Sequence, residues 1–468
     1  MRLLTWVPVS VCLCVLAEPA WAAKITIGDQ GGFVDVGVIA QTWVRVAENG
    51  ATDHAGPSFD IYLRRMRIYV NGAVNAHFGI ISNTDVSYTQ GTITNATGVI
   101  TNPETAQNVV RFSSPTIVLN EALGYWAVCP EFIFQAGLQL LPWVRQTATD
   151  ITKFSALDEQ GDVTERGRPT GFFGRNRDMG LVVRGLLFNN RIDYRVGVFN
   201  GVQSFAGSSV YTASGFVSAG SNKLGAPVAD VYYAPYGAVN PGDSPSFDGL
   251  VRINFLGYEP DYSLLGIAYN GKAYFAIGGG VNYQPRAIPP TGRTVSFNSY
   301  TASYEGYFAD LHLDLPFGND LAYELVVEAG WVRTVYSGNG APVDSKNAAG
   351  LALVNNAGNG YYGTVGMRFG IIYPYFAFED YQSNLSPSSV NGVTYLATYG
   401  STAGVPAGLV GNLTTYHVGL KFFISPPPGN QFMIDLEMAF QNKESPANPA
   451  APVSGNQWYG TVEFQFKI

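Results

Sequence analysis

Apolar and polar residues alternate one by one through the last segment of the chain, Trp458–Ile468. A β-strand points successive side chains to opposite faces, so this segment has one apolar face and one polar face. Such a strand suits a soluble sandwich, whose apolar face covers a core, or a membrane barrel, whose apolar face meets lipid. The rest of the chain has to decide between these two classes.

Alternation of this kind recurs along the chain, whereas helical periodicity is nearly absent. The candidate strands are Gly32–Val46, Phe59–Val70, Asn75–Tyr88, Val109–Val128 (with a bend near Pro115), Glu131–Leu140, Asp178–Phe188, Arg191–Phe199, Gly249–Leu256, Ala273–Tyr283, Ser299–Leu315, Leu321–Tyr336, Tyr361–Ile371, Tyr373–Tyr381, Leu413–Ile424, Gln431–Phe440 and Trp458–Phe466. An even number of strands is typical of bacterial single-chain barrels, and about 10 residues of a tilted strand cross the apolar band. The pattern predicts an all-β fold, a transmembrane antiparallel β-barrel of 16 strands.

The connections between these segments alternate between short and long. Short ones include Asn71–Val74, Asn189–Asn190, Pro316–Asn319 and Ser425–Gly429. Long ones are Thr89–Asn108, Leu141–Arg177, Gly201–Asp248, Ser337–Gly360 and Gln382–Asn412. Barrels of the outer membrane have short periplasmic turns and long external loops, whereas a sandwich has no reason to sort its loops by parity. The segment Gly257–Lys272 departs from the rule, because it is long where a short turn is expected.

The N-terminus predicts export. Arg2 is followed by the apolar run Leu3–Ala17 and then by Ala20-Trp21-Ala22. This is the pattern of a secretory signal peptide over residues 1–22, with cleavage after Ala22 and one barrel domain over residues 23–468. Only Cys129 remains in the mature chain, so an internal disulfide is excluded, and we expect this cysteine to be an inert turn residue.

Composition narrows the function classes. Charged residues make up 13%, aromatic residues 13%, and glycine occurs 54 times, which suits an apolar belt with aromatic girdles. The net charge of −8 argues against a nucleic-acid partner. Four histidines and no zinc-type spacing predict neither a metal site nor a cofactor. An outer-membrane enzyme such as a barrel lipase would need a poised serine and histidine, and no histidine lies in such a motif.

One stretch of the chain resembles a known family. Asn176-Arg177-Asp178-Met179-Gly180-Leu181-Val182-Val183-Arg184-Gly185, followed by Tyr194-Arg195-Val196-Gly197-Val198-Phe199-Asn200-Gly201, looks like the phosphate-selective porin family, the O and P porins of bacterial outer membranes. The segments Leu63–Arg67, Asn120–Tyr125 and Gly137–Gln139, with Pro142 after them, are similar to the same family. The likeness covers about residues 59–201.

The resemblance implies a channel in the bacterial outer membrane, usually a homotrimer, whose third external loop folds inward and narrows the pore. Here that loop would be Leu141–Arg177. The expected partners are membrane lipid and lipopolysaccharide, together with small hydrophilic solutes or anions. A porin carries out no reaction, so we expect no catalytic residues, and selectivity should come from charged side chains at a constriction.

Arginines and lysines of the lumen are the candidate anion-binding residues, because family members that prefer phosphate use them. Guanidinium forks bind phosphate oxygens in pairs. Arg65 and Arg67 share one face of the second strand, and alternation assigns Arg184 and Arg195 to the lumen. The inward loop offers Arg145, Lys153, Arg166, Arg168, Arg175 and Arg177.

A general or cation-leaning porin stays open as an alternative. The same loop carries the acidic residues Asp150, Asp158, Glu159, Asp162 and Glu165, so six basic against five acidic residues leave +1. The later strands place on lumenal faces Asp310, His312, Asp314, Glu324, Glu328, Glu379, Asp435 and Glu437. Opposed rows of charge are typical of non-selective porins as well. A secreted, soluble β-rich binding protein is the remaining alternative, and the sorted loops disfavour it.

Overall fold

The structure is a computed structural model. It describes residues 23–27, 31–48, 57–93, 110–149, 153–157, 177–201, 211–212, 215–216, 231–232, 244–259, 272–288, 302–318, 323–337, 358–383, 388–390, 393–395, 398–399, 408–409, 413–425, 432–443 and 455–467. The predicted signal peptide, residues 1–22, lies outside them.

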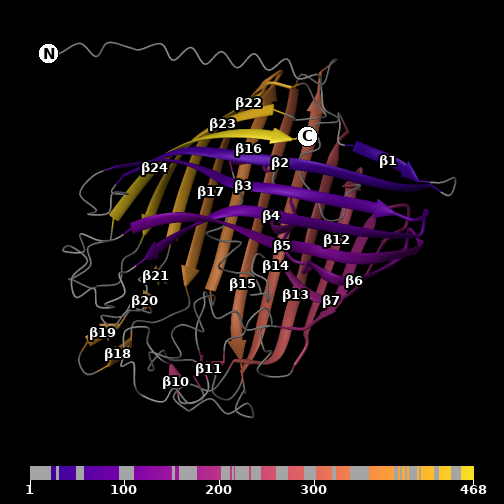
Figure 1. The fold of residues 1–468 in the computed structure, drawn as a ribbon, viewed down its shortest axis with the longest axis horizontal. Coiled ribbons are helices and arrows are strands. Elements are labelled where there is room, and N and C mark those ends of the chain that lie inside the picture. Colours follow the sequence, from indigo (N-terminus) through magenta and orange to yellow (C-terminus); the bar gives the residue numbers. More distant parts are fainter. Residues whose placement is uncertain are drawn as a thin grey trace.

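One antiparallel sheet of 17 strands makes up the body of the molecule, and all of its strands except β1 form a closed ring (Figure 1). The ring strands are β2 (Gly32–Ala47), β3 (Ser58–Ala73), β4 (Phe78–Ile93), β5 (Val110–Cys129), β6 (Phe132–Leu140), β7 (Arg177–Leu187), β8 (Ile192–Phe199), β12 (Ser246–Leu256), β13 (Tyr274–Ile288), β14 (Ala302–Phe317), β15 (Tyr323–Ser337), β16 (Gly358–Phe369), β17 (Ile372–Ser383), β22 (Leu413–Phe423), β23 (Phe432–Lys443) and β24 (Gly455–Lys467). Each pairs with its neighbour in sequence, and β24 pairs with β2, which closes the barrel.

The predicted barrel of 16 strands is confirmed. Each predicted segment overlaps one observed strand, with ends that differ by up to five residues, as at β4 and β13. The expected bend near Pro115 is replaced by an irregularity a little further on. The β4–β5 ladder runs in register through Pro115 and shifts at Asn120, the extra residue between Leu119 and Glu121.

The first described strand, β1 (Ala23–Ile27), completes one edge of β2. It pairs with Gly32–Val36, whereas β24 pairs with Ile39–Ala47 on the same edge. In Figure 1, β1 and the C-terminus accordingly lie at the same rim. The backbone of β2 is thereby paired along nearly its whole length, as lipid requires.

Short strands also occur within two long connections. Those between β8 and β12 are β9 (Tyr211–Thr212), β10 (Gly215–Phe216) and β11 (Val231–Tyr232), which form one small sheet. Those between β17 and β22 are β18 (Ser388–Val390), β19 (Val393–Tyr395), β20 (Thr398–Tyr399) and β21 (Gly408–Leu409), which pair two by two. The described residues include one short 3₁₀-helix, η1 (Arg145–Ala148).

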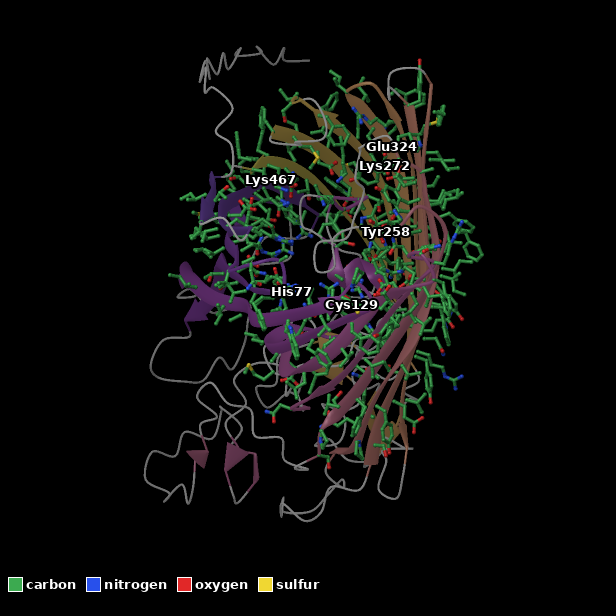
Figure 2. The ribbon with its side chains drawn as sticks, turned by 90° about the vertical axis from the view of Figure 1, so that its right-hand side faces the viewer. His77, Cys129, Tyr258, Lys272, Glu324 and Lys467 are labelled. Atoms are coloured by element: carbon green, nitrogen blue, oxygen red, sulfur yellow. The ribbon has the colours of Figure 1, made fainter. Side chains whose placement is uncertain are left out.

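The wall has apolar side chains outside and polar side chains inside. On β12, Asp248, Arg252 and Asn254 are 2–4% exposed, whereas Val251 and Ile253 are 51% and 47% exposed. The same alternation runs around the ring, and Figure 2 shows side chains projecting from both faces of the strands. A soluble domain would bury the apolar set, so this inverted distribution decides between the two classes that the sequence left open.

Aromatic side chains form two belts on the outer face. Pairs eight residues apart mark both belts on single strands: Phe247 and Phe255, Phe275 and Tyr283, Tyr361 and Phe369. Eight residues at about 3.3 Å each, tilted by about 40°, cover roughly 20 Å along the barrel axis. That height is close to the apolar band of outer-membrane barrels, roughly 25 Å. The predicted location in a bacterial outer membrane is thus confirmed.

Many glycines of the wall lie under aromatic rings that point into the lumen. A Cβ atom added to Gly37, Gly366 or Gly419 would overlap the ring of Tyr69, Tyr373 or Tyr375, respectively. Each ring therefore lies flat across its neighbouring strand, an arrangement known from other sheets as aromatic rescue of glycine. This packing accounts for part of the high glycine content of the chain.

Among the described residues, no helix is long and apolar enough to cross a membrane.

The outer face makes a first prediction. Val251 lies midway between the belt residues Phe247 and Phe255 and is 51% exposed. Substitution Val251→Arg should lower the free energy of unfolding in lipid vesicles by about 2–4 kcal/mol, because a charge then faces the middle of the bilayer. Urea unfolding followed by tryptophan fluorescence measures this loss. The control Val251→Leu should stay near wild type, and equal stability of the two variants would contradict the assigned face.

Candidate functional site

The connection after β6 enters the barrel and lies against its inner wall. Its described parts, residues 141–149 and 153–157, are called the inward segment below. The backbone N–H of Arg145 donates to Asp310 Oδ2 of β14 at 2.9 Å, and Ser155 Oγ donates to Glu328 of β15. Lys421 of β22 donates to the carbonyl oxygen of Phe154 at 3.0 Å. Three separate strands therefore hold this segment by polar contacts.

Apolar side chains fix the same segment across the lumen. The Trp143 ring lies 4.8 Å from that of Phe308, centroid to centroid. Phe154 packs with Ile39 of β2, and Ala156 packs with Val326 of β15. The strands β2 and β15 belong to different sides of the barrel, so the inward segment bridges its interior.

Arg145 is the centre of a buried network of charges. Its Nε lies 3.1 and 3.0 Å from the two carboxylate oxygens of Glu259, and its Nη1 binds Glu328. Arg252 of β12 extends the network, because its Nη2 lies 3.2 Å from Asp310 Oδ1 and its Nη1 lies 3.8 Å from Glu259. The side chains of Arg145 and Glu259 are 3% and 11% exposed. Charge-assisted contacts of this kind are strong because little water competes for them.

The network shifts the pKa values of Glu259 and Arg145, neither of which belongs to a strand. Burial alone would raise the pKa of Glu259, but the positive charges of Arg145, His312 and Arg252 outweigh it and lower that pKa below its ordinary value of 4.5. Burial alone would lower the pKa of Arg145, yet the carboxylates of Glu259 and Glu328 raise it above its ordinary range. Glu259 and Arg145 thus face each other as a stable ion pair.

A second cluster lies further along the wall. Lys421 Nζ lies 2.9 Å from Asp435 Oδ2, and His417 contacts Glu437 at 2.9 Å and Glu379 at 3.2 Å. Tyr375 donates its hydroxyl to Asp435 and Glu437 at 3.1 and 2.9 Å. His417 and Lys421 both lie on the lumenal face of β22, 9% and 2% exposed.

The predicted basic residues lie on strands, in the inward segment or outside the described residues. Arg65 and Arg67 lie side by side on the lumenal face of β3, and Arg67 forms two hydrogen bonds with Asp85, at 2.7 and 3.0 Å. Arg145 and Lys153 lie in the inward segment, Arg145 buried and Lys153 half-buried. Arg166, Arg168 and Arg175 lie outside the described residues.

Arg177 requires a correction. The sequence assigned it to the loop, but it is the first residue of β7, and its Nε lies 3.7 Å from Glu121. The boundary shifts because the β6–β7 ladder extends to the pair Leu140 and Arg177.

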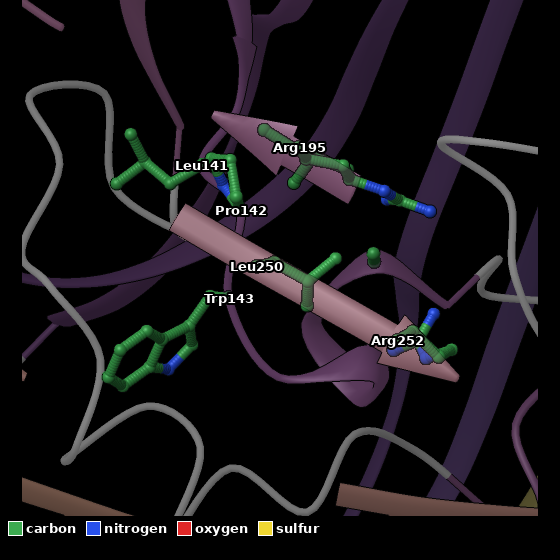
Figure 3. A pocket seen from close by; sticks show the side chains of 8 residues that line it. Leu141, Pro142, Trp143, Arg195, Leu250 and Arg252 are labelled. Carbon is green, nitrogen blue, oxygen red and sulfur yellow. The ribbon is translucent and has the colours of Figure 1, made fainter. Parts of the chain in front are cut away.

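Arg184 and Arg195 are brought together directly. They are cross-strand partners on β7 and β8, and Arg252 pairs in register with Asp193, two residues before Arg195. Arg195 Nη2 lies 2.8 Å from Asp193 Oδ2. Figure 3 shows Arg195 and Arg252 beside a small cavity that Leu141, Pro142, Trp143 and Leu250 also line. Its volume of about 10 Å³ is close to the minimum for a single water molecule.

The acidic residues that alternation placed in the lumen form one buried wall. This acidic wall is defined as the side chains that are 0–6% exposed on β14–β23: Asp310, Asp314, Glu324, Glu328, Glu379, Asp435 and Glu437. The inward segment contacts it through Arg145, Ser155 and the N–H of Leu157, which donates to Glu437. Burial therefore removes these carboxylates from contact with water in the lumen.

Half-buried charges remain on the lumenal faces elsewhere. The basic ones are Arg45, Arg64, Arg184 and Lys467, and the acidic ones are Asp35, Asp60 and Asp193; Lys153 of the inward segment is half-buried as well. Glu259 is also half-buried, but both its oxygens are bonded to Arg145. Arg64 lies over the Trp43 ring at 4.9 Å, which fixes its direction.

Two residues of the network were missed at the level of sequence. Arg252 could have been found, because Val251, Ile253 and Phe255 alternate with it on β12. Glu259 follows the end of β12, and its only signal was the unexpected length of Gly257–Lys272.

In the part of the chain that the structure describes, no cluster of three or more His, Cys, Asp or Glu residues has the geometry of a metal site. Cys129 is a free, half-buried residue at the end of β5, and Figure 2 labels it together with His77, which lies at the same rim. The ring of His77 contacts the carbonyl oxygen of Ala127 at 2.7 Å, so this histidine secures the rim of short connections.

Comparisons with known proteins give similar barrels at low identity. No family model and no curated protein matches the chain. Among solved structures, OprB of Pseudomonas putida has 10% identity and a TM-score of 0.47, over 93% of this chain and 94% of that one. OmpF of Salmonella typhi, in complex with daunomycin, has 10% identity and a TM-score of 0.46, over 95% and 100%. An anion-selective porin from Comamonas acidovorans has 10% identity and a TM-score of 0.45, over 93% and 100%.

The contact between Lys421 and the wall makes a second prediction. Lys421→Met leaves the fully buried Asp435 without its cation and removes the bond to the carbonyl of Phe154. The free energy of unfolding should fall by about 3–5 kcal/mol, as for other broken buried ion pairs. The double variant Lys421→Met/Asp435→Asn should recover part of this loss in urea unfolding. If the single variant is as stable as wild type, the assigned pair is wrong.

The lowered pKa of Glu259 makes a third prediction. A carboxyl group whose pKa is lowered in the folded state stabilises the fold fully above its ordinary pKa, and this contribution is lost as pH falls through the folded value. The stability gap between wild type and Glu259→Gln should therefore stay constant from about pH 8 to about pH 5 and narrow only below that. Urea unfolding in detergent across this range measures the gap. A gap that closes already between about pH 7 and about pH 5 would contradict the ion pair.

Proposed function

We propose that this chain is a porin, a passive diffusion channel for small hydrophilic solutes across the outer membrane. The observation that carries the proposal is the inverted wall, in which polar and charged side chains line the interior of a closed barrel. Barrels of about 16 strands are wide enough to leave an aqueous channel, whereas barrels of about 8 strands are filled by their own side chains. The inward segment lies inside the barrel and narrows this interior.

We further propose that the channel prefers anions, phosphate among them. Two features support this preference. The acidic wall is buried, and the inward segment contacts three of its carboxylates, whereas the half-buried charges that remain include Arg64 and Arg184 on opposite sides of β4–β6. The stretch that resembles the phosphate-selective porins lies in this same part of the wall, around β3, β7 and β8. A cation-leaning porin is the alternative, because Asp60 and Asp193 are half-buried too.

The proposal includes the homotrimer that the resemblance implies, embedded among membrane lipid and lipopolysaccharide. The aromatic belts on the outer face suit such an environment. Stability rests on the closed hydrogen-bonded ring, in which every strand is paired on both sides.

Reversal potential in a KCl gradient tests the selectivity. Purified protein in a planar bilayer should give stable unitary currents, closing in three equal steps for a trimer, with an anion-selective reversal potential. Arg184→Gln should lower the chloride-to-potassium permeability ratio by about two-fold, and Asp60→Asn should raise it by a similar factor. Phosphate should reduce the chloride current.

A matched control exists on the outer face. Arg333 of β15 is exposed there, so Arg333→Gln removes the same charge without touching the lumen, and its permeability ratio should equal that of wild type. A cation-selective wild-type channel would contradict the anion preference but not the porin. Absence of unitary currents would contradict the porin itself.

A further inference from the structure

The connection between β12 and β13 is longer than the other connections at the same end of the barrel. The other connections on that side, those after β3, β5, β7, β14, β16 and β22, contain two to eight residues, whereas this one contains 17, residues 257–273. Only its first three and last two residues are described, and the third is Glu259. Its extra length departs from the rule for periplasmic turns. The contacts of Glu259 suggest what this departure achieves.

Glu259 meets a residue that enters the barrel from the opposite rim. β12 ends at the rim of short connections, and Glu259 follows it by three residues. Arg145 follows the end of β6, which lies at the rim of long connections, by five residues. Their side chains share three contacts: Nε of Arg145 lies 3.0 and 3.1 Å from the two carboxylate oxygens, and Nη2 binds one of them as well. The pair therefore joins two connections that start at opposite ends of the barrel, and neither partner belongs to a strand.

The two arginines do not require Glu259 as a partner. Without it, the network already contains two arginines, Arg145 and Arg252, and two carboxylates, Asp310 and Glu328. Glu259 adds a third carboxylate, and its contacts with Arg145 offset the loss of hydration that burial imposes on it. Because these contacts are made to Arg145, they stabilise the position of that residue.

We propose that Glu259 is a positioning residue for the pore: it holds Arg145 from the periplasmic side and thereby keeps the inward segment against the acidic wall. This inference rests on the proposed porin function, because the width of the path matters only if solutes pass. In this arrangement the aperture depends on both rims. The wall supplies Glu328 and Asp310, and the connection after β12 supplies the third anchor.

The first measurement is unitary conductance. Glu259→Gln keeps the shape of the side chain and removes its charge, so the inward segment should loosen and the conductance should exceed that of wild type, with additional substates. Glu259→Asp retains the charge on a shorter side chain and should give an intermediate value. Glu131→Gln is the matched control. Glu131 is exposed in the short β5–β6 turn of the same rim, and removal of its charge should leave the unitary conductance at the wild-type value.

The second measurement does not depend on channel activity. Ser155 is completely buried against Glu328. In a background where Cys129 is replaced by Ser, the substitution Ser155→Cys introduces one thiol that a water-soluble methanethiosulfonate reagent can label. Adding Glu259→Gln should accelerate the labelling at least about tenfold, because loss of a buried charge partner favours local opening. Heat-modifiable gel mobility confirms that each variant still forms a barrel.

The outcomes separate the two proposals. Faster labelling together with larger conductance in Glu259→Gln, with Glu131→Gln at wild-type values, supports the positioning role. Labelling and conductance that both stay at wild-type values in a folded Glu259→Gln barrel overturn it. A wild-type protein without any unitary current, whose thiol is nevertheless labelled faster after Glu259→Gln, overturns the porin and leaves the contact between the two rims standing.

Discussion

The backbone hydrogen bonds of a strand in lipid have no water to bind, and this constraint governs the whole structure. Every edge must find a partner, and the barrel meets that demand by pairing Ile39–Ala47 of β2 with β24. The short strand β1 covers the part of the same edge that β24 does not reach. Closure then imposes the rest: the outer face must be apolar, and polar side chains can lie only inside.

An interior filled with charge brings a constraint of its own. Ionised groups that leave water need partners, and in this barrel the partners come from several strands and from the inward segment. Arg145 compensates Glu328 and Glu259, Lys421 compensates Asp435, and Arg67 compensates Asp85. Because the acidic wall is buried, the half-buried charges lie mostly on the side of β2, β3 and β7. The proposed anion preference is a consequence of this unequal burial.

The strands were predictable from sequence because their signal is local. Residue 251 faces lipid and residue 252 faces the lumen, and alternation alone separates them, as it does for Arg184 and Arg195. The connections were predictable only in length. Nothing local shows that Arg145 reaches Glu328, 183 residues later in the chain, or that Glu259 turns back into the barrel. Contacts of that range depend on closure of the ring, which no short window of sequence contains.

The position of Arg177 shows the same limit on a smaller scale. Strand ends depend on the partner strand, here Leu140 of β6, and hence on register rather than on residue type. The long connection Gly257–Lys272 is the instructive exception. It is long where a short periplasmic turn is expected, and this departure marks the place where an additional charged residue, Glu259, enters the lumen.

Solute entry into proteoliposomes tests the central claim, an open and wet interior, most directly. Vesicles that contain the purified protein are diluted into isosmotic solutions of neutral sugars of increasing size, and swelling is followed by light scattering. We expect swelling with small sugars at rates that fall steeply with size, because the inward segment leaves only part of the lumen open. Swelling no faster than in protein-free vesicles for every sugar would contradict it.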